Sequence, residues 1–138
     1  MDKLTPERRS ANMRAIRSNG MKPELRVRQL VHSLGYRFRL HRKDLPGKPD
    51  LAFIGRKKAI FVHGCFWHQH PDPNCTDARV PKSNLSYWIP KLQRNVARDA
   101  SQRCTLEERG WKVLTVWDCE TKDIPTLRER IRSFLDLG

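Results

Sequence analysis

Apolar residues recur along this chain with two different periods, which divide it into helices and strands. Residues 22–35 carry them at helical spacing and predict a helix with one buried face, opened by Pro23 and ended by Gly35. Residues 6–18 are rich in arginine and predict a basic helix with few core positions. Residues 36–40 alternate apolar and basic side chains, which is the pattern of a half-buried strand.

Three further strands are predicted at residues 50–54, 59–62 and 111–117, with a hairpin turn at 55–58. The run 59–62 is entirely apolar, so we expect it to be buried on both faces. A long helix is expected to follow Ser83 and Asn84, which would cap it, and to reach residue 110, with Pro90 as a candidate interruption. A closing helix is expected at 124–137. This order predicts an α/β fold in which helices flank a mixed central β-sheet.

The 138 residues suit one domain with a substantial core, since 38% of them are hydrophobic. No apolar stretch approaches the ~20 residues that a membrane span needs, so no membrane contact is expected. The first nine residues lack the apolar run of a signal peptide, and we therefore expect a cytoplasmic protein.

Lys and Arg number 28 against 15 Asp and Glu, which leaves a formal net charge of +13. A chain this basic repels itself unless a polyanion offsets the charge, so DNA or RNA is the expected partner. One alternative is a basic protein that is merely soluble. Another is an anionic membrane surface, which fits less well because no basic amphipathic helix with an aromatic face stands out.

Histidines and cysteines gather in residues 63–75. In a cytoplasmic chain this mixture indicates zinc more often than disulfides. A tetrahedral structural zinc site could be closed if the strand 111–117 lies beside the strand 59–62, and its ligands would be Cys65, His70, Cys75 and Cys119. The alternative is that Cys65 and Cys119 are small core residues and that the histidines are exposed to solvent. Cys104, in the long helix, is expected to belong to the core.

Asp50 is a candidate ligand of a different kind, because it follows a proline-rich turn at the start of a strand. A carboxylate in that place, beside a strand that ends in a polar residue, is typical of nucleases that bind Mg²⁺. This ion prefers oxygen ligands and keeps most of its waters. The alternative is an ordinary turn residue.

Five segments resemble the very short patch repair (Vsr) DNA mismatch endonucleases, in the same order and over nearly the whole chain. They are NMRAI at 12–16, PGKPD at 46–50, IFVHGCFWH at 60–68, NVARD at 95–99 and VWDC at 116–119. The resemblance implies a single restriction-endonuclease-like domain over residues 1–138, whose basic helix in residues 1–20 contacts DNA. It also implies a strand-specific nick on the 5′ side of the T in a T·G mismatch. Such mismatches arise when 5-methylcytosine deaminates, so a link to a cytosine-5 DNA methyltransferase, and possible contact with mismatch-repair proteins, is implied as well.

The resemblance further assigns roles in the chemistry. Asp50 would bind Mg²⁺, His63 and His68 would act on the phosphate, and Glu24 would help to orient a catalytic histidine. Zinc would be bound by the same three cysteines and one histidine that ligand chemistry alone indicates as a zinc site. The third strand lacks the second acid and the lysine of the usual nuclease pattern, so the backbone carbonyl of Val62 becomes a candidate Mg²⁺ ligand. A histidine, which titrates near neutrality, can then transfer the proton. Which histidine is base and which is acid stays open.

Two groups of DNA contacts are implied. Phe66, Trp67 and Trp88 would form a wedge that enters the base stack at the mismatch, where stacking is weak. Met13 and Ile16 would enter from the other groove. The alternative is that Trp88 is ordinary helix core and only Trp67 touches DNA. Polar side chains would contact phosphates or, for the last of them, a base edge: Asn12, Arg14, Arg17 and Asn95.

Two other functions remain open at this point. One is a catalytically silent, zinc-bearing DNA-binding module, and the other is a nuclease of the same fold without mismatch preference. One departure bears on the chemistry, since Val62 stands where members of the family carry Thr and a hydroxyl role there would be lost. A T·G pair has no two-fold partner site, so we expect a monomer.

Overall fold

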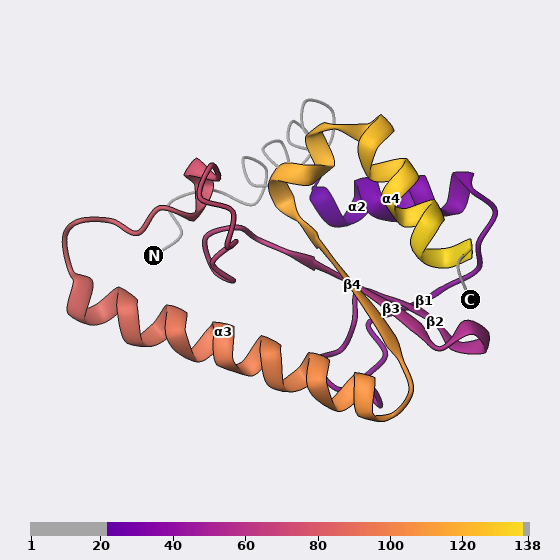
Figure 1. Ribbon diagram of the computed structural model, residues 1–138, viewed down its shortest axis with the longest axis horizontal. Coiled ribbons are helices and arrows are strands. Elements are labelled where there is room, and N and C mark those ends of the chain that lie inside the picture. The colour runs from indigo at the N-terminus through magenta and orange to yellow at the C-terminus, as the bar shows by residue number, and fades with distance from the viewer. Residues whose placement is uncertain (1–21, 137–138) are drawn as a thin grey trace, which may run out of the picture.

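The computed structural model describes residues 22–136, and a four-stranded mixed sheet lies at its centre (Figure 1). β1, β2 and β3 pair as antiparallel neighbours, whereas β4 runs parallel to β3. The order in the sheet is also the order along the chain: β1 (Arg39–Leu40), β2 (Leu51–Phe53), β3 (Lys58–His63) and β4 (Lys112–Trp117). The mixed α/β sheet expected from the sequence is confirmed.

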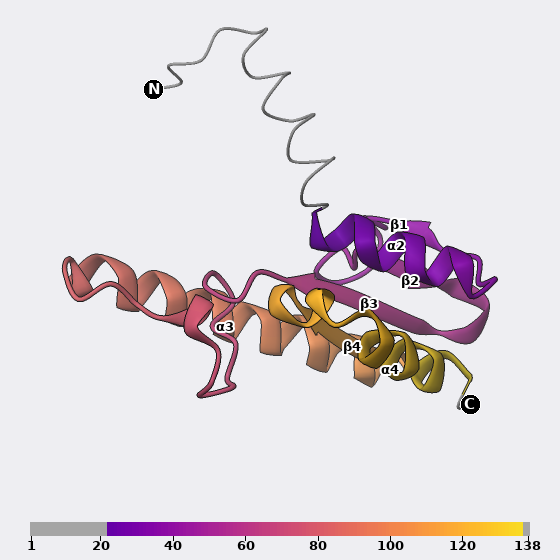
Figure 2. The same cartoon turned by 90° about the horizontal axis from the view of Figure 1, so that it is seen from above.

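Helices cover both faces of this sheet, as Figure 1 shows. α2 (Pro23–Ser33) and α4 (Ile124–Asp136) lie side by side on one face, and α3 (Leu85–Glu108) covers the other. Seen from above, α3 reaches past the end of the sheet, next to the loop that follows β3 (Figure 2). This overhang brings the first half of α3 to the loop in which histidines and cysteines cluster.

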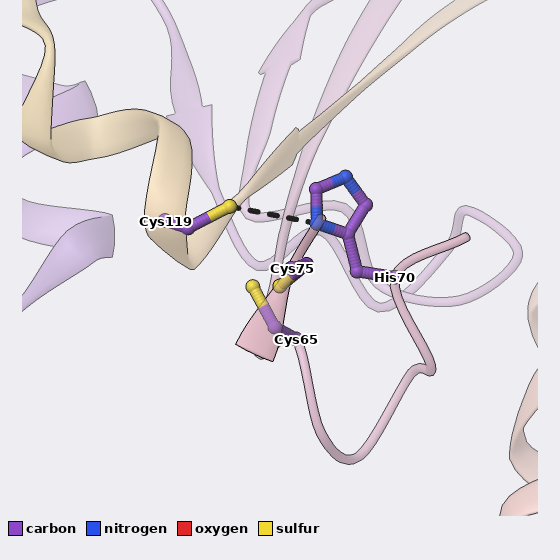
Figure 3. Close-up of side chains that lie close together, drawn as sticks. All are labelled: Cys65, His70, Cys75 and Cys119. Carbon is purple, nitrogen blue, oxygen red and sulfur yellow. Dashed lines mark hydrogen bonds between the residues drawn. The ribbon is translucent and has the colours of Figure 1, made fainter. Parts of the chain in front are cut away.

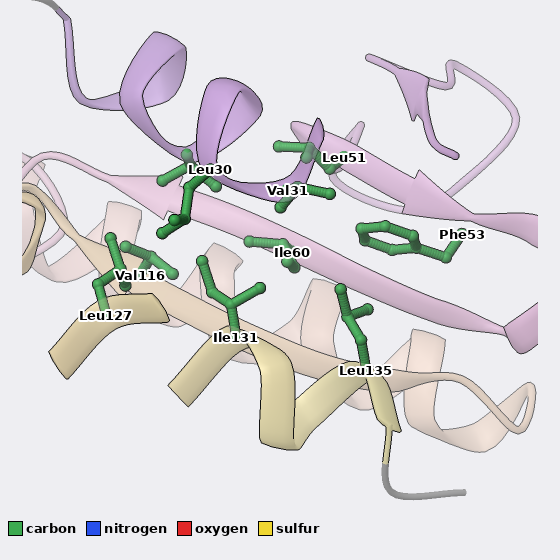
Figure 4. Packing of buried hydrophobic residues seen from close by; sticks show 10 residues of the cluster. Leu30, Val31, Leu51, Phe53, Ile60, Val116, Leu127, Ile131 and Leu135 are labelled. Carbon is green, nitrogen blue, oxygen red and sulfur yellow. The ribbon is translucent and has the colours of Figure 1, made fainter. Parts of the chain in front are cut away.

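β3 is the centre of the core. Ala59, Ile60 and Phe61 are all buried, which confirms that the strand is covered on both faces. Successive side chains of a strand point to opposite faces. Ile60 therefore packs in the cluster beneath α2 and α4 (Figure 4), whereas Ala59 and Phe61 pack in the cluster beneath α3. The two layers of the core thus meet at this strand, and its end carries the residues of the candidate site.

β1 is shorter than the strand expected at residues 36–40. Only Arg39 and Leu40 pair with β2, and both are exposed, so the expectation of a half-buried strand was wrong for them. β1 is an edge strand with a neighbour on one side only, and little covers it. Tyr36 and Phe38 pack against the core from outside the strand. The turn expected at 55–58 is a 3₁₀ helix, Ile54–Arg56.

Pro90 does not interrupt α3, which is continuous from Leu85 to Glu108. This proline lies in the second turn of the helix and is exposed, so the carbonyl that loses its N–H partner can bond water. Asn84 occupies the N-cap position as expected, yet its side chain makes no capping hydrogen bond.

Cys104 is exposed, so the expectation that it belongs to the core was wrong. Leu106, two residues further along α3, is fully buried against the sheet. Two residues turn a helix by about 200°. The face that carries Cys104 is therefore directed to solvent.

The helix expected at residues 6–18 lies outside the described residues. So do five expected DNA contacts: Asn12, Met13, Arg14, Ile16 and Arg17. Within residues 22–136, none of the helices combines the length and the apolar character that crossing a membrane requires.

Candidate active site and metal centre

Asp50 and Val62 meet where β2 begins and β3 ends. Antiparallel pairing sets Leu51 opposite Ile60, so the residue before β2 lies beside the last residues of β3. The backbone N–H of Val62 donates a hydrogen bond of 2.6 Å to Oδ2 of Asp50. The carboxylate is thereby held at the end of the strand pair.

The surroundings of Asp50 disfavour its charged form. Burial raises the pKa of Asp50 above its usual value, the Val62 N–H opposes that rise, and the nearby Glu24 carboxylate adds to it. A cation placed between the two carboxylates would offset both effects. Asp50, Glu24 and His41 each offer one ligand atom, and these atoms all lie within 4.8 Å of one another. Two carboxylate oxygens in such a cluster suit a hard divalent cation.

The histidine that Glu24 contacts is His41. Oε1 of Glu24 lies 2.8 Å from Nε2 of His41 and 2.9 Å from Nη2 of Arg28, in the next turn of α2. Neither His41 nor Arg28 stands in a motif that marks it as a site residue in the sequence. His41 precedes the turn into β2 in a stretch without any metal-ligand spacing, and only the folding of this turn over the start of α2 brings it to Glu24.

His63 and His68 stack against each other, with ring centroids 3.9 Å apart and an interplanar angle of 7°. His63 is the last residue of β3, and His68 lies in the loop that turns back over it. Burial and, to a smaller extent, the adjacent His68 lower the pKa of His63 to about 4, against the opposing effect of Asp99. His63 is therefore neutral near pH 7.

Asp99, on α3, fixes the orientation of His68. Nδ1 of His68 lies 2.5 Å from Oδ2 of Asp99, and both side chains are largely buried. With Nδ1 engaged, Nε2 is the ring nitrogen of His68 that remains for a substrate. Sequence analysis did not assign a role to Asp99. The signal that could have found it is its place on the buried side of α3, four residues after Asn95.

These groups line a common cleft of about 560 Å³. Asp50, Val62, His63, His68 and Asp99 form one part of its wall. Three cationic side chains supply much of the rest: Lys43, Lys48 and Arg98. Carboxylates, imidazoles and cations around one opening are the groups that bind and hydrolyse a phosphodiester.

The four residues expected to bind zinc come together, as Figure 3 shows. One ligand atom from each of Cys65, His70, Cys75 and Cys119 lies within 4.8 Å of all the others. Nδ1 of His70 lies 3.5 Å from Sγ of Cys119. Three sulfurs and one imidazole can hold a metal ion in a closed tetrahedral shell.

Strand register explains this convergence. His63 of β3 is paired with Trp117 of β4 in the parallel ladder, and Cys65 and Cys119 each follow two residues later. Burial raises the pKa of the Cys65 thiol, and burial and the neighbouring thiols of Cys65 and Cys75 raise the pKa of Cys119 to about 12. Such crowded thiols lose their protons when a cation binds them.

Phe66, Trp67 and Trp88 form a triangle of rings, with centroids 5.1, 5.3 and 5.9 Å apart. The Trp67 side chain is 46% exposed, and Trp88 is half-buried, outside both hydrophobic core clusters. Trp88 is therefore not ordinary helix core. Tyr87, which is 56% exposed, adds a fourth ring against Trp88 at 4.9 Å, and Lys91 lies over Trp67 and Tyr87. Neither Tyr87 nor Lys91 stands out in the sequence as a candidate DNA contact.

Comparison with known proteins places these features in a family. A family model described as "DNA mismatch endonuclease Vsr" matches residues 1–75. The chain is 51% identical to "Type II nicking enzyme V.XorIIP" of Xanthomonas oryzae pv. oryzae, over 98% of this chain and 97% of that protein. It is 41% identical to "DNA mismatch endonuclease Vsr" of Escherichia coli K12, over 86% of this chain and 72% of that protein.

A solved structure supports the fold. The catalytic domain of the homing endonuclease I-Bth0305I superposes with a TM-score of 0.56 at 22% identity, over 82% of this chain and 92% of that domain. The restriction-endonuclease-like fold expected from the sequence is thus confirmed. By family match and by identity over almost its entire length, this chain belongs to the Vsr family of DNA endonucleases, which are hydrolases.

Proposed function

We propose that this protein is a Mg²⁺-dependent endonuclease that nicks one strand of duplex DNA on the 5′ side of the T in a T·G mismatch. The observation that supports it most is that Asp50, the stacked His63–His68 pair and Asp99 line one cleft. The exposed Trp67 directly precedes His68 in the chain, so a group suited to enter DNA adjoins the groups suited to cut it.

Asp50 and the Val62 carbonyl would hold the Mg²⁺. The repulsion between Asp50 and Glu24, and the burial that raises the pKa of Asp50, fit a hard cation at this place. Bound there, Mg²⁺ would neutralise the charge that develops on the phosphate. Glu24 would act on the water shell rather than on His63 or His68, because its hydrogen bonds go to His41 and Arg28.

The two histidines have different surroundings, which suggests different roles. Asp99 engages Nδ1 of His68, and a carboxylate in that place stabilises an imidazole that takes up a proton at Nε2. His68 would therefore accept the proton of the attacking water. His63 is buried and neutral near pH 7. It can therefore donate a hydrogen bond to the phosphate or position the water without adding a second positive charge beside His68.

Mismatch selection would come from Phe66, Trp67 and Trp88. A mispair stacks weakly, so the insertion of apolar side chains costs least there. Asn95 would read a base edge, and Asn12, Met13, Arg14, Ile16 and Arg17 of the basic N-terminal segment would add contacts to phosphates and to the opposite groove. Residues 1–138 would act together as one domain and as a monomer.

Zn²⁺ would occupy the cluster of Cys65, His70, Cys75 and Cys119. Three thiolates and an imidazole match this ion in softness and number. The loop between β3 and α3 is largely exposed, so a metal that ties it to the end of β4 would hold His68 over the cleft. The protein would act in the cytoplasm, in cells with a cytosine-5 DNA methyltransferase that creates the deamination-prone base. Mismatch-repair proteins would act downstream of the nick.

A nicking assay on end-labelled duplexes tests the proposal. One duplex carries a single T·G mismatch and its control the matched T·A pair, with flanking contexts pooled, and each is incubated with Mg²⁺ or with EDTA. We expect a Mg²⁺-dependent nick beside the T that is absent from the T·A duplex. Equal nicking of both duplexes would favour a nuclease without mismatch preference. Tight binding without a nick would favour a silent DNA-binding module.

A further inference from the structure

Both ends of the Asn95 side-chain amide are engaged within the protein. Its Nδ2 donates a hydrogen bond of 3.0 Å to the backbone carbonyl of Trp67. Its Oδ1 accepts one of 3.0 Å from Nη2 of Arg98, one turn further along α3. An Asn amide has two N–H donors and two lone pairs on its oxygen, and these contacts use one of each. Bidentate pairing with a base edge is therefore favoured when the amide turns away from them.

Arg98 stands at the nuclease cleft. Its side chain is exposed and lines the same opening as Lys43, Lys48, Asp50 and the two histidines. A guanidinium can bind two phosphate oxygens at once, which a lysine ammonium cannot do. While Nη2 of Arg98 is bound to Asn95, one of the five N–H donors of the guanidinium is not available to a phosphate.

From this arrangement we infer that Asn95 restrains Arg98 in the free protein, and that mismatch recognition releases Arg98 to bind the phosphate at the cleavage site. The inference rests on the proposed function and adds to it a mechanism that couples recognition to cleavage. When Asn95 turns to a base edge, its Oδ1 leaves the guanidinium. Arg98 then gains the freedom to bind the phosphate in the bidentate geometry that a pentavalent transition state favours.

The connection to the wedge makes the release selective. The side-chain amide of Asn95 is hydrogen-bonded to the backbone carbonyl of Trp67, and Trp67 carries the exposed ring of the aromatic triangle. Entry of this ring into a weakly stacked step moves its backbone relative to α3 and weakens the Nδ2 contact. A matched pair resists the insertion, so it leaves Asn95 and Arg98 together. The next residue after Trp67 is His68, whose Nδ1 contacts Oδ2 of Asp99 on the same helix as Asn95.

Single-turnover nicking of the T·G and T·A duplexes, at saturating enzyme, separates this coupling from a simple contact role. In Asn95→Ala, Arg98 is free without a mismatch, so we expect the rate on the matched duplex to rise and the T·G to T·A rate ratio to fall roughly tenfold or more. In Asn95→Asp, a carboxylate holds the guanidinium more firmly, and the nicking rate should fall on both duplexes.

Arg98→Ala should lower the nicking rate on T·G DNA roughly tenfold or more, while the Kd for the same DNA, measured by fluorescence anisotropy, changes far less. Arg98→Lys should recover part of the rate. The double variant with Asn95→Ala should be as slow as Arg98→Ala alone, since the restraint has nothing left to act on. Arg94→Ala removes an exposed arginine from the same helix, away from the cleft, and should leave the rate ratio unchanged.

A matched-duplex rate in Asn95→Ala at or below the wild-type rate would overturn the coupling, because it would make Asn95 a reader of the base and nothing more. Equal effects of Arg98→Ala and Arg94→Ala on the rate would overturn the role of Arg98. Failure of the wild-type protein to prefer T·G would be a failure of the proposed function itself, and it is visible before any variant is compared.

Discussion

Trp117 stacks on His70, with ring centroids 4.5 Å apart and an interplanar angle of 15°. The same indole meets the ring of His63 edge to face at 5.4 Å. A single residue at the end of β4 therefore joins the candidate zinc site to the candidate nuclease site. β4 is paired with β3 along its whole length, so both sites are built on the ends of the same pair of strands.

Loss of the metal should therefore cost stability and activity together. In Cys119→Ser we expect the bound Zn²⁺, counted by atomic emission, to fall from one per chain to none. The free energy of unfolding should drop by about 3 kcal/mol or more, since metal binding at such a site is coupled to folding. Cys104→Ser alters an exposed cysteine outside the cluster and should keep both metal and stability. Full stability of the metal-free protein would contradict the structural role.

Asp50→Asn should reduce the nicking rate by at least about 100-fold while DNA binding persists, because a neutral amide oxygen lacks the negative charge with which a carboxylate holds a hard cation. The same change should leave the thermal midpoint equal or higher. The folded protein raises the pKa of Asp50, so keeping it charged near pH 7 opposes folding, and a neutral amide removes that opposition. Asp44→Asn, an exposed carboxylate paired with Arg42, is the matched control for the rate.

Asp99→Asn should slow nicking roughly 10²–10⁴-fold with little change in DNA affinity, since the carboxylate orients the ring of His68. Asp99 also raises the pKa of His63. The variant should thus lower the pKa of His63 still further, as followed through its ring protons by NMR. Glu107→Gln, an exposed acid on the same helix, should change neither quantity. An unchanged rate in Asp99→Asn would remove Asp99 from the mechanism.

The depressed pKa of His63 predicts how folding stability depends on pH. The pKa is 6.5 for the unperturbed group and about 4 in the folded protein. Between these values the unfolded chain binds a proton that the folded one does not. The contribution of neutral His63 is fully present above pH 6.5 and is lost as the pH falls toward 4. Denaturant titrations across this window should show a shallower decline in His63→Gln than in the wild type, both saturated with Zn²⁺.

Trp67→Ala should weaken binding to T·G DNA by about 1–3 kcal/mol, the usual loss when a base loses an aromatic partner. Binding to matched DNA should weaken less, because the wedge enters a well-stacked step only at a cost. Fluorescence anisotropy on both duplexes measures the difference. Leu85→Ala removes another exposed apolar side chain near the start of α3 and serves as the control. Equal losses on both duplexes would show that Trp67 contributes contact but no selectivity.

The periodicity of the chain predicted α2, α3, α4 and the three strands of the core, because each of these elements buries one face or both and must repeat its apolar residues accordingly. It failed at residues 36–40. Their alternation is that of a half-buried strand, but exposure at the sheet edge depends on what lies beside them, which no local pattern records. It also failed at Cys104, where the register of α3 against the sheet decides which face is covered.

The four ligand types and the positions of Cys65 and Cys119 just past two strand ends favoured a common site, since a parallel pair of strands brings its ends together. The tertiary structure alone revealed Asp99 beneath His68, His41 beside Glu24, and the Asn95 amide between Trp67 and Arg98. Each of these contacts joins segments that are unrelated in local sequence or fixes the direction of a side chain. Tertiary packing decides such contacts, whereas the period of the apolar residues and the chemistry of the candidate ligands can be identified in the sequence alone.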